Sequence, residues 1–246
     1  MIFLFVGLLI WFYSLKHLKK AFLFFLIYKI FLVTNINVLS LPGVPILSLD
    51  MCLTLWFFFW ILRKKKMLHF CQRSMPFHKP MIFIAVVYFI SALFSVAGFG
   101  SALSAYIKDL CGIFITPWMI WKVVETEKDF IFLIKGMMVA FFITCIYAFI
   151  ENYIQANPLV EYETTLVQDS SRVIDFRYDI DELRGYRVQS VFEHPIGAGL
   201  NWAMFAVLML FLWWTKECQN LRLNVYFVFL LAILCILCIC ISNCRA

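Results

Sequence analysis

Charged side chains are scarce in this chain of 246 residues. Only 15% of its residues are Asp, Glu, Lys or Arg, whereas an average soluble domain has about 25%. In contrast, 64% of the residues are hydrophobic and 19% are aromatic. So few charges cannot cover the water-exposed surface of a protein of this size. The composition therefore excludes an ordinary soluble domain and favours a single integral membrane domain over residues 1–246.

No basic groove interleaved with aromatic side chains can be found, although the formal net charge is +6. The lysines cluster in short loops beside apolar runs, where positive charge orients membrane spans. We therefore expect the lipid bilayer as a partner, and no nucleic acid.

Cysteine is absent from residues 155–195, which excludes a disulfide framework there. Cys235 and Cys238 form a Cys-x-x-Cys pair, but no second pair and no nearby His accompany it. Since a structural zinc site needs about four ligands, we interpret most of the nine cysteines as small buried side chains in helices. We expect no metal and no cofactor.

Long apolar runs fill most of the chain, and a spanning helix needs about 20 such residues. The runs cover residues 1–15, 21–39, 46–62, 81–98, 103–124, 130–150, 196–214 and 225–241. They predict an all-α, polytopic transmembrane bundle of about eight spans. The first run lacks a basic leader and a small-residue cleavage site, so it predicts an anchor rather than a removed signal peptide. Lys108-Asp109 and Pro117 interrupt the fifth run and suggest a kinked or shallow helix.

The basic loops 16–20 and 63–79 are separated by two spans, so they share one side of the membrane. Placing them in the cytoplasm puts the N-terminus, the Pro/Gly loop at 42–45 and the long segment 155–195 outside. The segment 155–195 is the only sizeable polar stretch and thus the candidate external loop.

This segment contains Arg172, Arg177, Arg184 and Arg187, eight acids and no Lys. Arginine binds phosphate through a rigid fork of donors, which favours a phosphate or diphosphate ligand. The alternative is that these arginines pair with the neighbouring acids on a wet surface. Residues 174–180 alternate apolar and charged side chains, which favours a strand over a helix.

The segment ends at the start of the seventh run. Pro195 suits the first turn of a helix, and the positive end of that helix would face the loop, beside Arg187. His194 is either a proton-transfer group or a capping or interfacial residue. Lys29, Lys108 and Asp109 lie inside apolar runs, where charge is costly and often functional.

Three stretches carry a family resemblance between about Ile107 and Ala246. They are Tyr147-Ala-Phe-Ile-Glu-Asn-Tyr-Ile-Gln155, Arg187-Val-Gln-Ser-Val-Phe-Glu-His194-Pro195 and Ile241-Ser-Asn-Cys-Arg-Ala246. In order and spacing they resemble the O-antigen ligase and O-antigen polymerase family. Cys244 stands where the family usually has Ser, and the chain stops where members continue with more spans and a second external loop. We therefore expect a C-terminally truncated member that is incomplete as an enzyme.

The resemblance implies a metal-independent glycosyltransferase of surface polysaccharide biosynthesis in the bacterial inner membrane. Such an enzyme moves a glycan from a polyprenyl diphosphate carrier to a hydroxyl of lipid A core (a ligase) or of another repeat unit (a polymerase). It implies catalytic roles for Arg187 and His194, and diphosphate binding by Arg177, Arg184 and Arg187. The first alternative is a transporter or flippase component that uses Lys29, Lys108 and Asp109. The second alternative is a structural subunit.

Overall fold

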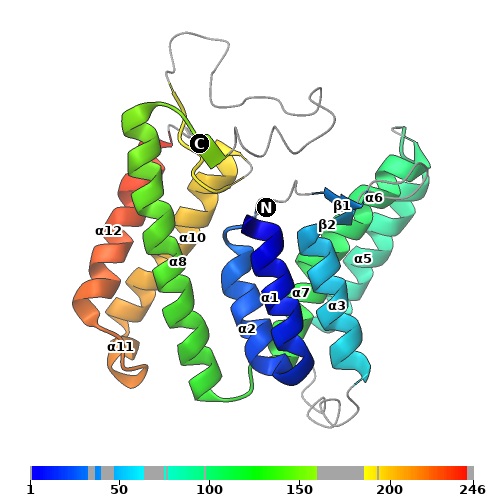
Figure 1. Ribbon diagram of the computed structural model, residues 1–246, viewed down its shortest axis with the longest axis horizontal. Coiled ribbons are helices and arrows are strands. Elements are labelled where there is room, and N and C mark those ends of the chain that lie inside the picture. Colours follow the sequence, from blue (N-terminus) through cyan, green and yellow to red (C-terminus); the bar gives the residue numbers. More distant parts are fainter. Residues whose placement is uncertain are drawn as a thin grey trace. The chain divides into compact units, whose positions relative to one another are not determined.

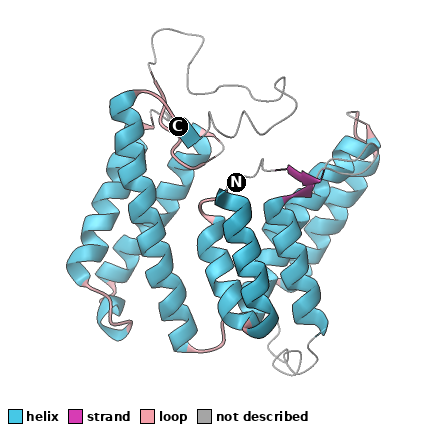
Figure 2. Cartoon of the chain, viewed as in Figure 1, coloured by secondary structure: helices cyan, strands magenta, loops and turns pink. Residues whose placement is uncertain are grey.

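The computed structural model describes residues 2–32, 37–39, 47–63, 75, 77–96, 98–159, 186–192 and 194–242. Within these residues the chain is mostly helical, as predicted, with one short pair of strands (Figures 1 and 2). Arg172, Arg177, Arg184, the alternating stretch 174–180 and residues 243–246 lie outside the described residues. The predictions that concern them stay predictions.

The helices follow the apolar runs closely in most places. The elements are α1 Ile2–Lys16, α2 Leu18–Lys29, β1 Asn37–Leu39, β2 Leu47–Ser48, α3 Leu49–Arg63, α5 His78–Leu93, α6 Phe99–Asp109, the π-helix η2 Leu110–Ile115, α7 Thr116–Val123, α8 Glu127–Ile154, α10 Pro195–Trp214, α11 Glu217–Asn220 and α12 Val225–Ile241. Among the described residues, α8 and α10 are long and apolar enough to cross a membrane. Most of α1, and all of α5 and α12, are apolar but shorter.

The second apolar run does not form one long helix, so the prediction of a span over 21–39 is wrong in its second half. Helix α2 ends at Lys29, and Asn37–Leu39 pairs with β2 as an antiparallel strand. The amides of residues 30–32 each donate to a carbonyl three residues earlier, as in a tightened last turn. Lys29 is therefore at a helix end rather than in mid-span.

The fifth run is a continuous helical stretch whose middle is η2. The amide and the Oγ1 of Thr116 both donate to the carbonyl of Cys111, and the Oγ1 bond is 2.7 Å long. Pro117 follows at the start of α7, where a missing N–H is tolerated. Lys108 and Asp109 are the last residues of α6. The predicted interruption is thus a local change of helix type.

Helix α8 starts three residues before the apolar run because of a capping box. The carboxylate of Asp129 accepts from the amide of Thr126 at 3.0 Å, and the Asp129 amide donates to the Thr126 hydroxyl at 3.2 Å. The ammonium of Lys19 lies 2.7 Å from the same carboxylate and 3.4 Å from that of Glu125. These contacts fix the helix start among charged residues.

The chain divides into two compact units. Unit 1 comprises Met1–Phe25 and Asn37–Phe130 and contains α1, the start of α2, and α3 to α7. Aromatic rings join its first helices, because Phe22 and Phe25 of α2 both pack on Phe57 of α3. The rings of Phe25 and Phe57 stack at 5.2 Å.

Unit 2 comprises Leu26–Ile36 and Ile131–Ala246. Its helices α8, α10 and α12 lie side by side and alternate in direction (Figure 1). Trp202 and Met209 of α10 and Leu231 of α12 are completely buried in its core. Helix α11 joins α10 and α12 at one end of this bundle. The last residues of α8 and the first residues of α10 lie at the opposite end (Figure 1).

The buried cysteines of unit 2 behave as the sequence predicted. Cys145, Cys235 and Cys238 are completely buried where α8 meets α12, and the sulfurs of Cys145 and Cys235 lie 3.8 Å apart. The thiol of Cys218 in α11 is also buried and donates to the carbonyl of Leu212 at 3.3 Å. Burial raises the pKa of the Cys218 thiol, which keeps it protonated and unreactive at neutral pH.

Candidate functional site

A buried carboxylate near the end of α8 holds the segment that leads into α10. Glu151 is completely buried. Its Oε1 accepts from the Tyr186 hydroxyl at 2.9 Å and from the Gln189 amide at 3.2 Å. Its Oε2 accepts from the Ser190 amide at 2.6 Å. A buried acid needs such donors, because burial without them costs several kcal/mol. Glu151 therefore fixes residues 186–190 against α8.

Ser190 is held by further hydrogen bonds. Its φ angle is 54°, in the left-handed region that non-glycine residues adopt only when neighbours fix them. Its hydroxyl donates to the Thr144 carbonyl at 2.9 Å, and its carbonyl accepts from Asn157 at 2.8 Å. Asn157 in turn accepts from the Tyr147 hydroxyl at 2.9 Å. The stretches that begin at Tyr147 and Arg187, far apart in sequence, are thus bonded together.

His194 is the N-cap of α10. Its Nδ1 accepts from the amide of Ile196 at 3.0 Å, and Pro195 is the first helical residue, as predicted. The capping interpretation of His194 is therefore confirmed. Because Nδ1 accepts this bond, Nε2 is the nitrogen from which the ring can donate to another group.

A cavity of about 560 Å³ lies beside the start of α10, within unit 2. Lys29, His194 and Asn201 are its polar lining residues, and Gly197 leaves it open because no side chain enters there. Its remaining lining residues are apolar, namely Leu26, Ile30, Leu32, Met137, Phe141, Val191 and Phe192. Lys29 and the positive end of α10 favour an anion in this cavity, while the apolar walls favour a hydrocarbon group.

The predicted site residues are only partly brought together. His194 lines the cavity, whereas Arg187 lies partly buried in the segment held by Glu151 and does not line it. Arg177 and Arg184 are outside the described residues. Across the described part of the chain, no group of three His, Cys, Asp or Glu is placed to hold a metal ion.

Sequence reasoning did not predict that three residues of this region would lie at or beside the site. Glu151 was quoted only as part of a resembling stretch, although a single acid near the end of a long apolar run is itself a signal. Lys29 was named only for the alternative, a transport pathway, and it lines the same cavity as His194. Asn201, the seventh residue of α10, had no feature in the sequence that marked it as a site residue.

The chain matches no protein-family model, no curated protein and no solved structure.

Proposed function

We propose that the chain is a multi-pass membrane protein. The observation that carries this proposal is the outward face of α8, α10 and α12. On α10, the side chains of Leu200, Met204, Val207 and Phe211 are 58–66% exposed, although its opposite face is buried in the core. A helix that is apolar on both faces is suited to lipid rather than to water. Exposed apolar side chains also lie along the outward faces of α8 and α12.

In the proposed orientation, α1, α3, α5, the α6–α7 stretch, α8, α10 and α12 are spans, and the second crossing needs α2 together with the chain that follows it as far as β1. The lysine-rich loops 16–20 and 63–79 are cytoplasmic, and 155–195 is external. Helix α8 has 28 residues, which correspond to about 42 Å and exceed the ~30 Å hydrocarbon layer.

We infer that the protein acts in O-antigen or related surface polysaccharide biosynthesis in the bacterial inner membrane. It takes part in the transfer of a glycan from a polyprenyl diphosphate to a hydroxyl of lipid A core or of a growing glycan. Two observations support this inference. The stretches at 147–155 and 187–195 resemble a ligase and polymerase family and are bonded together through Glu151 and Ser190. The adjacent cavity combines Lys29 and His194 with apolar walls that suit a polyprenyl chain.

In this transfer, the acceptor oxygen bonds to the anomeric carbon while the bond from that carbon to the diphosphate oxygen breaks, and the hydroxyl proton passes to the departing diphosphate. Negative charge then grows on the leaving diphosphate, and preorganised cationic donors stabilise it. We assign the stabilisation of this negative charge to Lys29 and to the positive end of α10. His194 donates from Nε2 to a phosphate oxygen, since its Nδ1 is occupied by the Ile196 amide. Arg187 offers a bidentate fork from the neighbouring segment.

The first prediction concerns Lys29. In the full chain in nanodiscs, Lys29→Ala is expected to weaken binding of farnesyl diphosphate about tenfold, because one charge-assisted hydrogen bond is lost. Microscale thermophoresis measures the Kd. The control is Lys135→Ala, which removes an exposed lysine of α8 that does not line the cavity. Equal affinities for Lys29→Ala and the unmodified chain would exclude Lys29 from the diphosphate site.

The second prediction concerns Arg187. Arg187→Lys keeps the charge but loses the fork, so a large loss of surface polysaccharide is expected in the native host, with unchanged membrane insertion. Gel electrophoresis of the polysaccharide and immunoblotting of membranes measure the two effects. Near-normal polysaccharide from Arg187→Ala would remove this residue from the site.

The alternative function is transport of a lipid-linked sugar, which the position of Lys29 in the cavity also suits. A fluorescent lipid-linked sugar in proteoliposomes distinguishes the two functions. Transport moves the label across the bilayer without changing it, whereas transfer releases polyprenyl diphosphate.

A further inference from the structure

We propose that a second cavity, in unit 1, binds one hydrocarbon chain of an anionic phospholipid, with the lipid phosphate at the end formed by Lys122 and His78. The proposal rests on the membrane location proposed above, but not on glycan transfer. Its residues and its ligand differ from those of the cavity beside α10.

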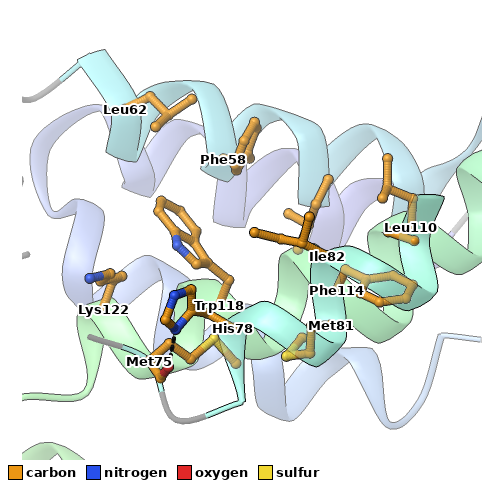
Figure 3. A pocket seen from close by; sticks show the side chains of 12 residues that line it. Phe58, Leu62, Met75, His78, Met81, Ile82, Leu110, Phe114, Trp118 and Lys122 are labelled. Atoms are coloured by element: carbon orange, nitrogen blue, oxygen red, sulfur yellow. Dashed lines mark hydrogen bonds between the residues drawn. The ribbon is translucent and has the colours of Figure 1, made fainter. Parts of the chain in front are cut away.

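The cavity has a volume of about 550 Å³ and is bounded by α3, α5, η2 and α7 (Figure 3). This volume is within the ~300–1,000 Å³ typical of ligand sites. Its walls are apolar, and the rings of Phe58 and Trp118 meet edge to face at 5.5 Å. The side chain of Ile82, another lining residue, is 61% exposed, so the cavity is not sealed.

The polar side chains that line the cavity, those of His78 and Lys122, lie toward one of its ends. Lys122 lies near the end of α7 and His78 begins α5, whereas Leu110 and Phe114 line the cavity farther along the helical stretch (Figure 3). From residue 110 to residue 122 the helical rise is about 18 Å. A chain that lies along this length would end at a cation. The lining residue Leu62 is followed by Arg63, the last residue of α3, which adds a second cation on this helix.

The π-helix is a second, independent indication of a site. Leu110, Phe114 and Ile115 all belong to η2 and all line the cavity. A π-helix turn is rare and is found frequently at functional sites. Here η2 lies next to the cavity rather than at a distance from it.

The charge of the polar end selects the class of lipid. In the proposed orientation, Lys122 faces the cytoplasm, and the cytoplasmic leaflet is the one rich in anionic lipids. Basic pockets between spans on this side bind anionic head groups. A zwitterionic head group would gain much less from the same cation.

Native mass spectrometry of the full chain in detergent tests the proposal, with phosphatidylglycerol and phosphatidylcholine as probes. We expect one phosphatidylglycerol to bind at least about fivefold more tightly than phosphatidylcholine, the effect of one lysine near a head group. Lys122→Gln should abolish this preference, and Lys122→Arg should retain it. Lys128→Gln is the matched control, since Lys128 is exposed and does not line the cavity. Equal binding of the two lipids, or an unchanged preference in Lys122→Gln, would overturn the proposal.

Filling the cavity provides a second measurement. Ala85 lines it, so Ala85→Phe should remove the tight site for either lipid while the circular dichroism remains helical. Retained tight binding in a folded Ala85→Phe protein would contradict the site. Farnesyl diphosphate binding in the same samples reports on the cavity beside α10, so a failure of the proposed transferase site can be told apart from a failure of this one.

Discussion

Replacing Glu151 with alanine is expected to release the segment 186–190 from α8 and to destabilise unit 2 strongly. The substitution leaves the Gln189 and Ser190 amides without their shared acceptor. A buried donor that loses its partner costs about 1–3 kcal/mol, and here two amides and the Tyr186 hydroxyl are affected. Thermal unfolding in detergent measures the stability, and hydrogen exchange of residues 186–192 measures the local release.

Two further variants separate the hydrogen bonds of Glu151 from its size. Glu151→Gln keeps the shape but has only one acceptor oxygen, so we expect an intermediate loss. Glu127→Ala, at the exposed start of the same helix, is the control and should change stability little. Wild-type exchange rates for residues 186–192 in Glu151→Ala would show that this carboxylate does not hold the segment.

The same substitution bears on the proposed function. The segment fixed by Glu151 contains Arg187 and leads directly to His194, the cap of α10. A displaced segment would move Arg187 and would separate His194 from the cavity that contains Lys29. Loss of polysaccharide in Glu151→Ala together with rapid exchange at 186–192 would therefore identify Glu151 as a positioning residue.

The helices were largely predictable because local signals agree with the apolar runs. The run at 225–241 coincides with α12, since Asn224 caps the helix through the amides of Tyr226 and Phe227. Pro195 likewise marks the start of α10. The prediction of one span over 21–39 was wrong in its second half, because apolar length alone does not distinguish one long helix from a helix followed by a strand.

The site was less predictable because its contacts are long-range. Arg187 and His194 could be selected from residue type and from their position before Pro195. The bonds of Glu151 to Tyr186 and Ser190 join residues 35 and 39 positions apart, and no helical or strand periodicity encodes such pairs. The shared cavity of Lys29 and His194 depends in the same way on how α2 meets α8 and α10.

The strongest test of the membrane proposal is the accessibility of the two ends of unit 2. Gln155 follows α8 and Asn220 ends α11, and both side chains are exposed. In the proposed orientation, a membrane-impermeant maleimide added to intact spheroplasts should label Gln155→Cys fully and Asn220→Cys not at all. Permeabilisation should make Asn220→Cys reactive. The expected difference in labelling between the two variants is nearly complete, because a charged reagent does not cross the hydrocarbon layer.

The native cysteines determine how this labelling is designed. Cys218 lies two residues from Asn220, but its thiol is buried and its pKa is raised by that burial, so it should remain unlabelled in folded protein. Cys240 is exposed on α12 and is replaced by Ser in every variant, and the Cys240→Ser protein alone gives the background. Labelling of Asn220→Cys but not Gln155→Cys in intact spheroplasts would reverse the orientation. Equal labelling of both sites without permeabilisation would show that α8 and α10 do not cross the membrane, and the proposed function would lose its basis.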